Sequence, residues 1–249
     1  MITAIHSHHG YPMIFGDCCV SWQFRKKGEI HRDELQKIYI LDPSFAIAYS
    51  TDDVMVVQEI LRNFDINNWR NMLAEYNQTA GVQLAILYMK DGSPRLETWD
   101  SSDPEAFMEV ERGKSRILGS GGEIESLKSI ADKVADLPIE DVTGLAALFV
   151  NDYMQQYDDK WAEKGVHGLL HTAACSADRT MIVYQETETA EALDRWQGRK
   201  YSVSMTYDDD TDTWFQINKL TDERIPLVNL LRQDLEYREG DLLFDPRAD

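Results

Sequence analysis

The chain has 249 residues, of which 43% are hydrophobic, so it can bury one substantial core and we expect one main domain. Its 25 Lys and Arg residues are outnumbered by 44 Asp and Glu residues, which gives a formal charge of −19 at pH 7. This negative field repels phosphate backbones and anionic lipid surfaces, so we expect neither nucleic acid nor a membrane as a partner.

The N-terminal residues and the cysteines bear on the cellular compartment. The first residues lack a basic flank followed by an apolar segment, and no window approaches the roughly 18 apolar residues of a membrane span. We therefore expect a cytoplasmic protein. Its three cysteines, Cys18, Cys19 and Cys175, form neither a disulfide framework nor a zinc-binding spacing. We expect reduced thiols and no metal or cofactor.

The first part of the chain predicts strands followed by a helix. Residues 2–7 and 11–16 flank the turn sequence HHG and predict a β-hairpin. A charged loop, RKKGEIHRDE, leads into KIYILDPSFAIAYS, whose β-branched and aromatic residues around a central DP turn predict two more strands. Asp52 and Asp53 are suited to cap a helix whose apolar residues, from Val54 onward, share one face.

The middle of the chain predicts another hairpin, two helices and two further strands. VQLAILYMK and PRLETW are joined by Asp91-Gly92, and SRILGSGG is typical of a strand that runs into a glycine turn. Two apolar-periodic segments, around Leu127 and Phe149, predict helices separated by Pro138. GLLHTAAC and TMIVYQ then predict strands on either side of SADR.

Beyond residue 185 the chain predicts a short amphipathic segment (ETAEALDRW), a hairpin with an acidic turn (YSVSMTYDDDTDTWFQI) and a final helix around LVNLLRQDL. Two antiparallel sheets with helices outside explain this order of elements better than a parallel βαβ arrangement does. We therefore predict an α+β fold, with one domain over residues 1–185. Residues 186–249 form a C-terminal extension that packs on this domain or makes subunit contacts.

Four motifs, by their order and spacing, resemble the proteasome β-subunit family and its bacterial relative HslV, the peptidase of a two-component ATP-dependent protease. They are IFGD at residues 14–17, Lys37 in QKIYIL, FAIAYSTDD at a strand-to-helix junction, and ILGSGG before a long helix. The resemblance covers residues 1–185. It implies a four-layer αββα sandwich of two antiparallel sheets flanked by helices, the fold of the N-terminal nucleophile (Ntn) hydrolases.

The resemblance also implies roles for particular residues. In the family an N-terminal threonine supplies its hydroxyl as the nucleophile and its own α-amino group as the base. Asp17 would orient Lys37, and Lys37 would keep the field around the nucleophile positive. Ser120 and Gly121 lie in the glycine turn, which would offer a backbone N–H to the developing oxyanion.

Position 1 departs from the family pattern, because Met1 has a thioether and no nucleophilic hydrogen. Ile2, which would be exposed if Met1 were removed, is equally inert. Where the family has Asp and then Ser-Gly-Gly, this chain has DDKWAEKGVHGLL, without the serine. We therefore predict a non-catalytic subunit, or pseudoenzyme, with a structural or binding role. By the resemblance it would form a homo-oligomeric ring or a dimer of rings and take a protein or peptide ligand.

A threonine-type peptidase or amidase is the alternative. Residues 1 and 3 of a strand point to the same face, so cleavage before Thr3 would expose a hydroxyl and a free amine on that face. These groups would sit about 6.6 Å further along the strand, at about 3.3 Å per residue. An unchanged site would not accept that displacement, and the two hypotheses stay open at this point.

Three other motifs have simpler explanations than a functional site. His167 and His171 are four apart in a strand-like segment, which would separate their side chains by about 13 Å and argues for packed or exposed histidines over a metal site. Cys18 and Cys19 are not N-terminal and are expected to be structural thiols. The run DDDTD lacks the glycine and glutamate of a calcium loop and predicts a hairpin turn.

Overall fold

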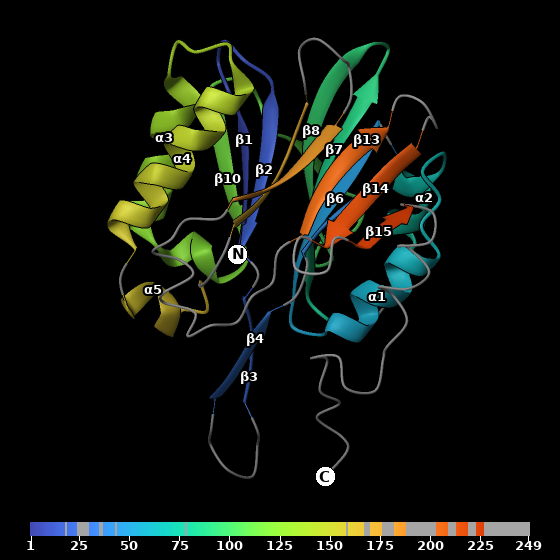
Figure 1. The fold of residues 1–249 in the computed structure, drawn as a ribbon. Coiled ribbons are helices and arrows are strands. Elements are labelled where there is room, and N and C mark those ends of the chain that lie inside the picture. Colours follow the sequence, from blue (N-terminus) through green and yellow to red (C-terminus); the bar gives the residue numbers. More distant parts are fainter. Residues whose placement is uncertain are drawn as a thin grey trace.

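A computed structural model describes most of the chain. The residues that it describes are 1–17, 19–23, 30–34, 37–42, 44–77, 79–157, 159–166, 170–175, 182–187, 203–208, 213–218 and 223–226. They form a mixed α+β fold built mainly on two antiparallel sheets (Figure 1), as the order of elements predicts. No helix among them has both the length and the apolar character needed to cross a membrane.

Each of the two main sheets has five strands. The first sheet contains β1 (Ile2–His6), β2 (Pro12–Asp17), β10 (Lys114–Leu118), β11 (Leu170–Cys175) and β12 (Ile182–Thr187), in the order β10-β1-β2-β11-β12. The second contains β5 (Ile38–Asp42), β6 (Phe45–Thr51), β7 (Val82–Lys90), β8 (Ser93–Asp100) and β9 (Phe107–Glu109), in chain order.

The remaining elements are helices and two smaller sheets. The helices are α1 (Val54–Arg62), α2 (Trp69–Ala74), α3 (Glu125–Asp136), α4 (Val142–Gln156), α5 (Asp159–Glu163) and the short 3₁₀ helix η1 (Gly119–Glu123). The smaller sheets are β3 (Cys19–Gln23) with β4 (Ile30–Glu34), and β13 (Val203–Asp208) with β14 (Thr213–Asn218) and β15 (Glu223–Pro226).

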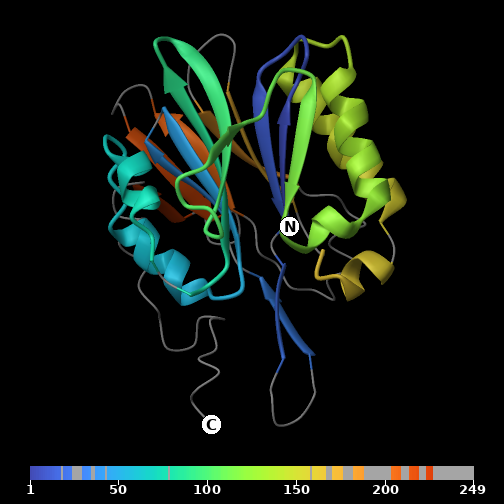
Figure 2. The same ribbon diagram turned by 180° about the vertical axis from the view of Figure 1, so that it is seen from behind.

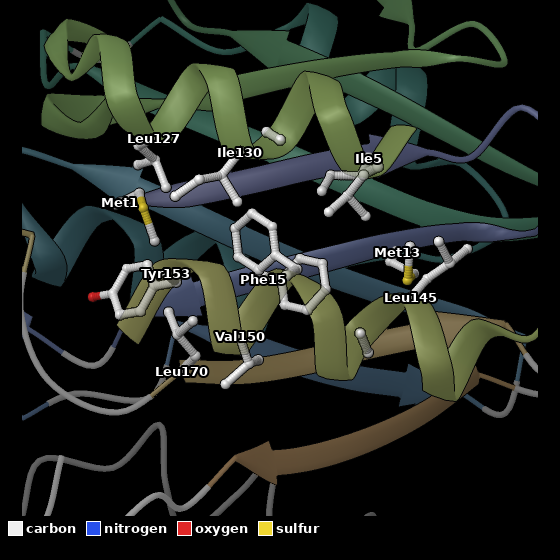
Figure 3. Close-up of a cluster of buried hydrophobic side chains, with 14 of the residues drawn as sticks. Met1, Ile5, Met13, Phe15, Leu127, Ile130, Leu145, Val150, Tyr153 and Leu170 are labelled. Carbon is white, nitrogen blue, oxygen red and sulfur yellow. The ribbon is translucent and has the colours of Figure 1, made fainter. Parts of the chain in front are cut away.

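Three clusters of buried apolar side chains hold the main sheets and helices together. One cluster lies between the two sheets and includes Ile14 from the first sheet and Leu87 from the second. Another joins the opposite face of the first sheet to α3 and α4 (Figure 3), and the third joins the opposite face of the second sheet to α1 and α2. Figure 2 shows the two pairs of helices on opposite sides of the molecule. This arrangement is compatible with a sandwich.

Two features predicted from short sequence segments, a helix cap and a hairpin turn, are present in the structure. Asp53 caps α1, because its side chain accepts a hydrogen bond of 3.0 Å from the backbone N–H of Met55. Asp91 and Gly92 connect β7 to β8 with φ angles of 52° and 71°. Positive φ at both positions is the requirement of a type I′ hairpin turn, which explains why this dipeptide joins the two strands.

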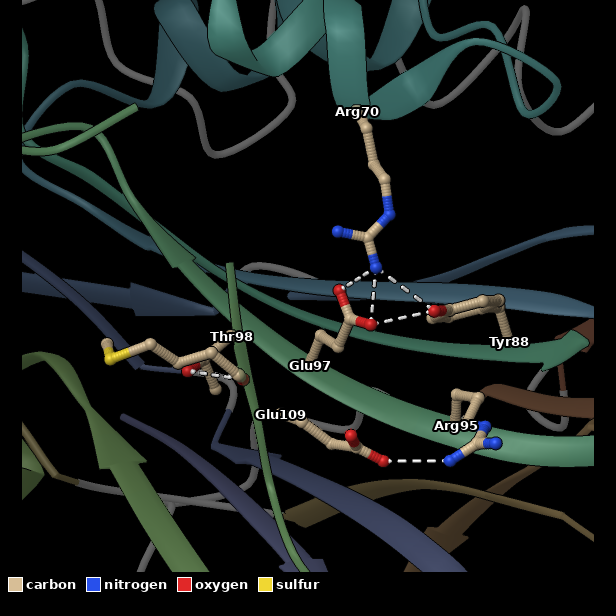
Figure 4. Close-up of polar contacts among 7 residues, drawn as sticks. Arg70, Tyr88, Arg95, Glu97, Thr98 and Glu109 are labelled. Atoms are coloured by element: carbon tan, nitrogen blue, oxygen red, sulfur yellow. Dashed lines mark hydrogen bonds and ion pairs between the residues drawn. The ribbon is translucent and has the colours of Figure 1, made fainter. Parts of the chain in front are cut away.

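Helix α2 is attached to the second sheet by a polar cluster (Figure 4). The guanidinium of Arg70 binds the carboxylate of Glu97 and donates to the hydroxyl of Tyr88, which in turn donates to Glu97 at 2.7 Å. The same guanidinium lies over the rings of Trp69 and Phe107, at 4.6 and 4.9 Å from their centroids. These contacts explain how a helix of only six residues keeps its place.

The prediction of a charged loop before residue 37 is wrong for residues 30–34. They form β4, which pairs with β3 in an antiparallel register from Cys19↔Glu34 to Gln23↔Ile30. The sequence IHRDE has little intrinsic strand preference, so the pairing overrides local propensity. The short strands β9 and β15 were likewise not predicted, because three or four residues are too few to show a period.

In the C-terminal part, β13 and β14 form the predicted hairpin, from Val203↔Asn218 to Asp208↔Thr213. Strand β12 runs to Thr187, slightly beyond the boundary expected at residue 185. The predicted segments ETAEALDRW and LVNLLRQDL lie outside the described residues, as do Cys18 and His167. Those predictions, and the division into a domain and an extension, stay predictions.

We predict that Phe149→Ala will destabilise the protein much more than Leu148→Ala, its neighbour on α4. Phe149 is fully buried and stacks on Phe15 with ring centroids 4.1 Å apart, whereas Leu148 is 38% exposed. Removing the Phe149 ring should lower the free energy of unfolding by about 3–5 kcal/mol, and the Leu148 change by about 0.5 kcal/mol or less. Urea denaturation measures both values, and similar losses would contradict the burial of Phe149 against Phe15.

Candidate functional site

Met1, Asp17 and Lys37 meet at one end of the first sheet, where the N-terminus is marked in Figure 1. Asp17 is the last residue of β2, and Lys37 directly precedes β5, so the two belong to different sheets. The Nζ of Lys37 lies 2.6 Å from Oδ1 of Asp17, and the α-amino nitrogen of Met1 lies 2.7 Å from the same oxygen. All three groups are buried. The sequence motifs therefore converge in space.

The charges of these groups are strongly coupled. Burial lowers the pKa of the Met1 α-amino group to about 6, and Lys37 adds to this lowering although Asp17 opposes it. Burial alone would raise the pKa of the Asp17 carboxyl, but the charges of Lys37 and the α-amino group outweigh burial and lower it. The site therefore contains the Lys37–Asp17 ion pair beside an α-amino group that is mostly neutral at pH 7.

The side chain of Met1 fills the space beside the glycine turn. It is only 2% exposed and belongs to the same apolar cluster as Leu127 and Tyr153 (Figure 3). A Cβ atom added to Gly121 would lie 2.6 Å from Cγ of Met1. The turn can approach residue 1 this closely only because position 121 has no side chain.

A side chain of the second sheet, Gln83 of β7, binds the first residue of this turn, Gly119. The backbone N–H of Gly119 donates to Oε1 of Gln83 at 2.7 Å, and Nε2 of Gln83 donates to Asp100 at 2.6 Å. Gly119 has a φ of +72°, and a Cβ atom there would lie 2.1 Å from Oγ of Ser50, so glycine is required. Ser120, the other predicted turn residue, is exposed to solvent. Sequence reasoning missed Gln83, because no motif connects it with the turn.

Thr3, the alternative nucleophile, lies inside β1. It is paired with Phe15 of β2 on one side and with Ile117 of β10 on the other. Its side chain is fully buried, and Oγ1 has no hydrogen-bond partner among the described residues. The two-residue period of a strand puts it on the face of Met1 and Ile5, toward α3 and α4. Thr3 is therefore enclosed within the core.

His171 is a further member of the site that sequence reasoning did not place there. It lies on β11 directly opposite Gly16 of β2 and is fully buried. Burial lowers its pKa to about 3, Asp17 opposes this effect, and Lys37 adds to it, so the imidazole is neutral at pH 7. The sequence spacing between His167 and His171 did not predict this position. The pairing of β11 with β2 brings His171 near Asp17.

The chemistry available at this site follows from its residues. It contains a buried carboxylate, a lysine, an amine and a neutral imidazole, with the thioether of Met1 packed beside them. No group of three or more His, Cys, Asp or Glu side chains is arranged to bind a metal ion in the part of the chain that the structure describes.

Comparison with known proteins finds no family model that matches the chain and no curated protein with significant sequence similarity to it.

We predict that Gly121→Ala will destabilise the protein, whereas Gly122→Ala will not. The added methyl group at position 121 would overlap Met1, but at position 122 the nearest atom is a backbone oxygen at 3.5 Å, an ordinary contact. Overpacking of this kind costs about 1–3 kcal/mol. Thermal and urea unfolding of both variants measure the difference, and equal stabilities would show that Met1 does not occupy this space.

We also predict that His171→Gln will reduce the loss of stability in acid. The pKa of His171 is lowered on folding from 6.5 to about 3, so between these values the unfolded chain takes up a proton that the folded chain does not. Stability from this group is therefore complete above pH 6.5 and is lost as the pH falls. Between pH 7 and pH 5 the loss is about 2 kcal/mol.

The measurement is the free energy of unfolding in urea at pH 7 and at pH 5. His9→Gln, at an exposed position, is the control and should keep the pH dependence of the unaltered protein. An equally large acid loss in His171→Gln would contradict the burial of a neutral imidazole.

Proposed function

We propose that this chain is a proteasome β/HslV-like protein with the Ntn-hydrolase fold, and that it is a non-catalytic structural or binding subunit of a homo-oligomer. The observation that carries this proposal is the position of Met1. Its α-amino group contacts Asp17, and its side chain packs on the glycine turn. In this proposal residue 1 corresponds to the family's nucleophile but lacks the chemical group that the reaction needs.

The arrangement of the core supports the fold assignment. The buried clusters lie between helices and sheet, between sheet and sheet, and again between sheet and helices. That order is the one expected for a four-layer αββα sandwich. The Lys37–Asp17 pair crosses from one sheet to the other at the end where the resemblance expects the site.

The burial of residue 1 supports the loss of catalysis. A nucleophile must come within about 3–3.5 Å of the carbonyl that it attacks. Met1 is 2% exposed and Asp17 is 1% exposed, so a substrate would have to displace packed side chains to reach them. The retained ion pair then contributes to structure instead of to a reaction.

The alternative, cleavage before Thr3, has weaker support. It would remove Met1 and Ile2, both of which are buried in apolar clusters, and would withdraw the amine from Asp17. The new terminus would begin inside the paired part of β1.

The test combines an activity assay with an assembly measurement. The purified protein should not hydrolyse a mixture of fluorogenic peptides above background, and it should form no covalent adduct with a peptide vinyl sulfone. Its intact mass should retain Met1, and light scattering after size-exclusion chromatography should show an oligomer.

Thr3→Val is the matched control, because valine keeps the shape of threonine and removes the hydroxyl. Hydrolysis by the unaltered protein that disappears in Thr3→Val would overturn the proposal in favour of the peptidase. A monomer at micromolar concentration would overturn its oligomeric part.

A further inference from the structure

Strand β9 is one edge of the second sheet. The order of that sheet is β5-β6-β7-β8-β9, so within the described residues β9 pairs only with β8. Figure 2 shows the segment that contains β9, between β8 and β10, on the near side of the molecule, with no helix or strand in front of it. Met108, the central residue of β9, is a large apolar side chain that is 40% exposed. This edge is therefore open to a partner.

The backbone groups on the open side of β9 belong to Phe107 and Glu109. The backbone N–H of Val110 donates to the carbonyl of Leu96 next to β8 at 2.9 Å. Backbone groups alternate in direction along a strand, so those of Met108 also point toward β8, and those of Phe107 and Glu109 point away from it. Within the described part of the chain, no strand pairs with that side of β9. An added strand would bind these two residues.

Exposed charges lie beside this edge (Figure 4). The side chain of Glu109 is 50% exposed and accepts a hydrogen bond of 3.0 Å from Arg95. The side chain of Arg70 is 44% exposed, and its guanidinium lies 4.9 Å from the centroid of the Phe107 ring. The hydrogen bonds of Arg70 to described residues use Nη2 alone, which leaves Nε and Nη1 for a further acceptor. A carboxylate placed beside Phe107 would therefore meet unused donors.

A second copy of the same strand meets these conditions in one register. In an antiparallel pair centred on Met108, Phe107 of each copy lies opposite Glu109 of the other, and each such pair exchanges both of its outward backbone hydrogen bonds. Each Glu109 carboxylate then lies beside the Phe107 ring and the Arg70 guanidinium of the second copy. A register centred on Glu109 would instead place two glutamates directly opposite each other, which is unfavourable. Charge therefore selects one alignment.

We propose that β9 is a self-association surface, through which two copies of this chain pair edge to edge about a two-fold axis at Met108. The second sheets of the two copies then form one continuous antiparallel sheet. Short edge strands that carry a charge usually resist such pairing, but in this register the charge of Glu109 binds Arg70 of the second copy. This inference rests on the oligomeric part of the proposed function and goes beyond it by naming the contact.

Disulfide cross-linking tests the contact directly. At the centre of the pair the two Met108 residues face each other with Cα atoms about 4.5 Å apart, a separation that a disulfide can span. Under mild oxidation we expect Met108→Cys to form a covalent dimer at least about tenfold faster than Met55→Cys, because pairing raises the effective concentration of the thiol. Met55 is the matched control, since it lies on α1 and is 44% exposed. The native cysteines are common to both variants.

A charge variant supplies a second readout. Glu109→Lys places a cation beside Arg70 of the second copy, so we expect the Kd of the dimer, measured by sedimentation equilibrium, to rise about tenfold or more. Glu105→Lys makes the same change in net charge at another exposed position and should leave the Kd unchanged.

Equal rates of cross-linking in Met108→Cys and Met55→Cys, or an unchanged Kd in Glu109→Lys, would overturn the proposal. If the unaltered protein is an oligomer in that case, the oligomeric part of the proposed function stands and only this contact is wrong. A monomer at micromolar concentration would overturn both. Neither measurement uses hydrolysis, so the non-catalytic part of the proposed function is tested separately.

Discussion

The ion pair between Asp17 and Lys37 is the constraint on which the site depends. It connects the last residue of β2 in one sheet with the residue before β5 in the other, over 2.6 Å and in a buried position. Removing water from two charges is costly, and the attraction between them offsets this cost only when their geometry is good. The two sheets must therefore meet at this end at one fixed spacing, and the apolar cluster between them provides it.

The same surroundings also explain the protonation state of the Met1 α-amino group. The α-amino nitrogen of Met1 is buried beside the Lys37–Asp17 pair, where burial and the charge of Lys37 disfavour a second positive charge more than Asp17 favours it. Burial consequently lowers the pKa of the α-amino group to about 6. The amine at neutral pH is then a hydrogen-bond donor to Asp17, and the thioether side chain completes the packing against Gly121.

The elements of the fold could be predicted largely from local signals. Asp53 predicts the start of α1, and Asp91-Gly92 predicts a hairpin turn. Both predictions are possible because a helix cap and a turn dipeptide depend on conformational preferences that act within a few residues. Residues 30–34 could not be predicted in this way. Their charged sequence has no strand period, and only pairing with β3 makes them a strand.

The sequence by itself determined which groups were available to the site: the IFGD strand end, Lys37, the glycine turn and Met1. These are properties of short segments, so they can be read without knowing the fold. Tertiary structure alone decided that His171 lies beside Asp17 and that Gln83 holds the turn at Gly119. Both residues are distant in sequence from their neighbours in space. Their placement depends on which strands pair and how the sheets pack, and no local preference encodes either.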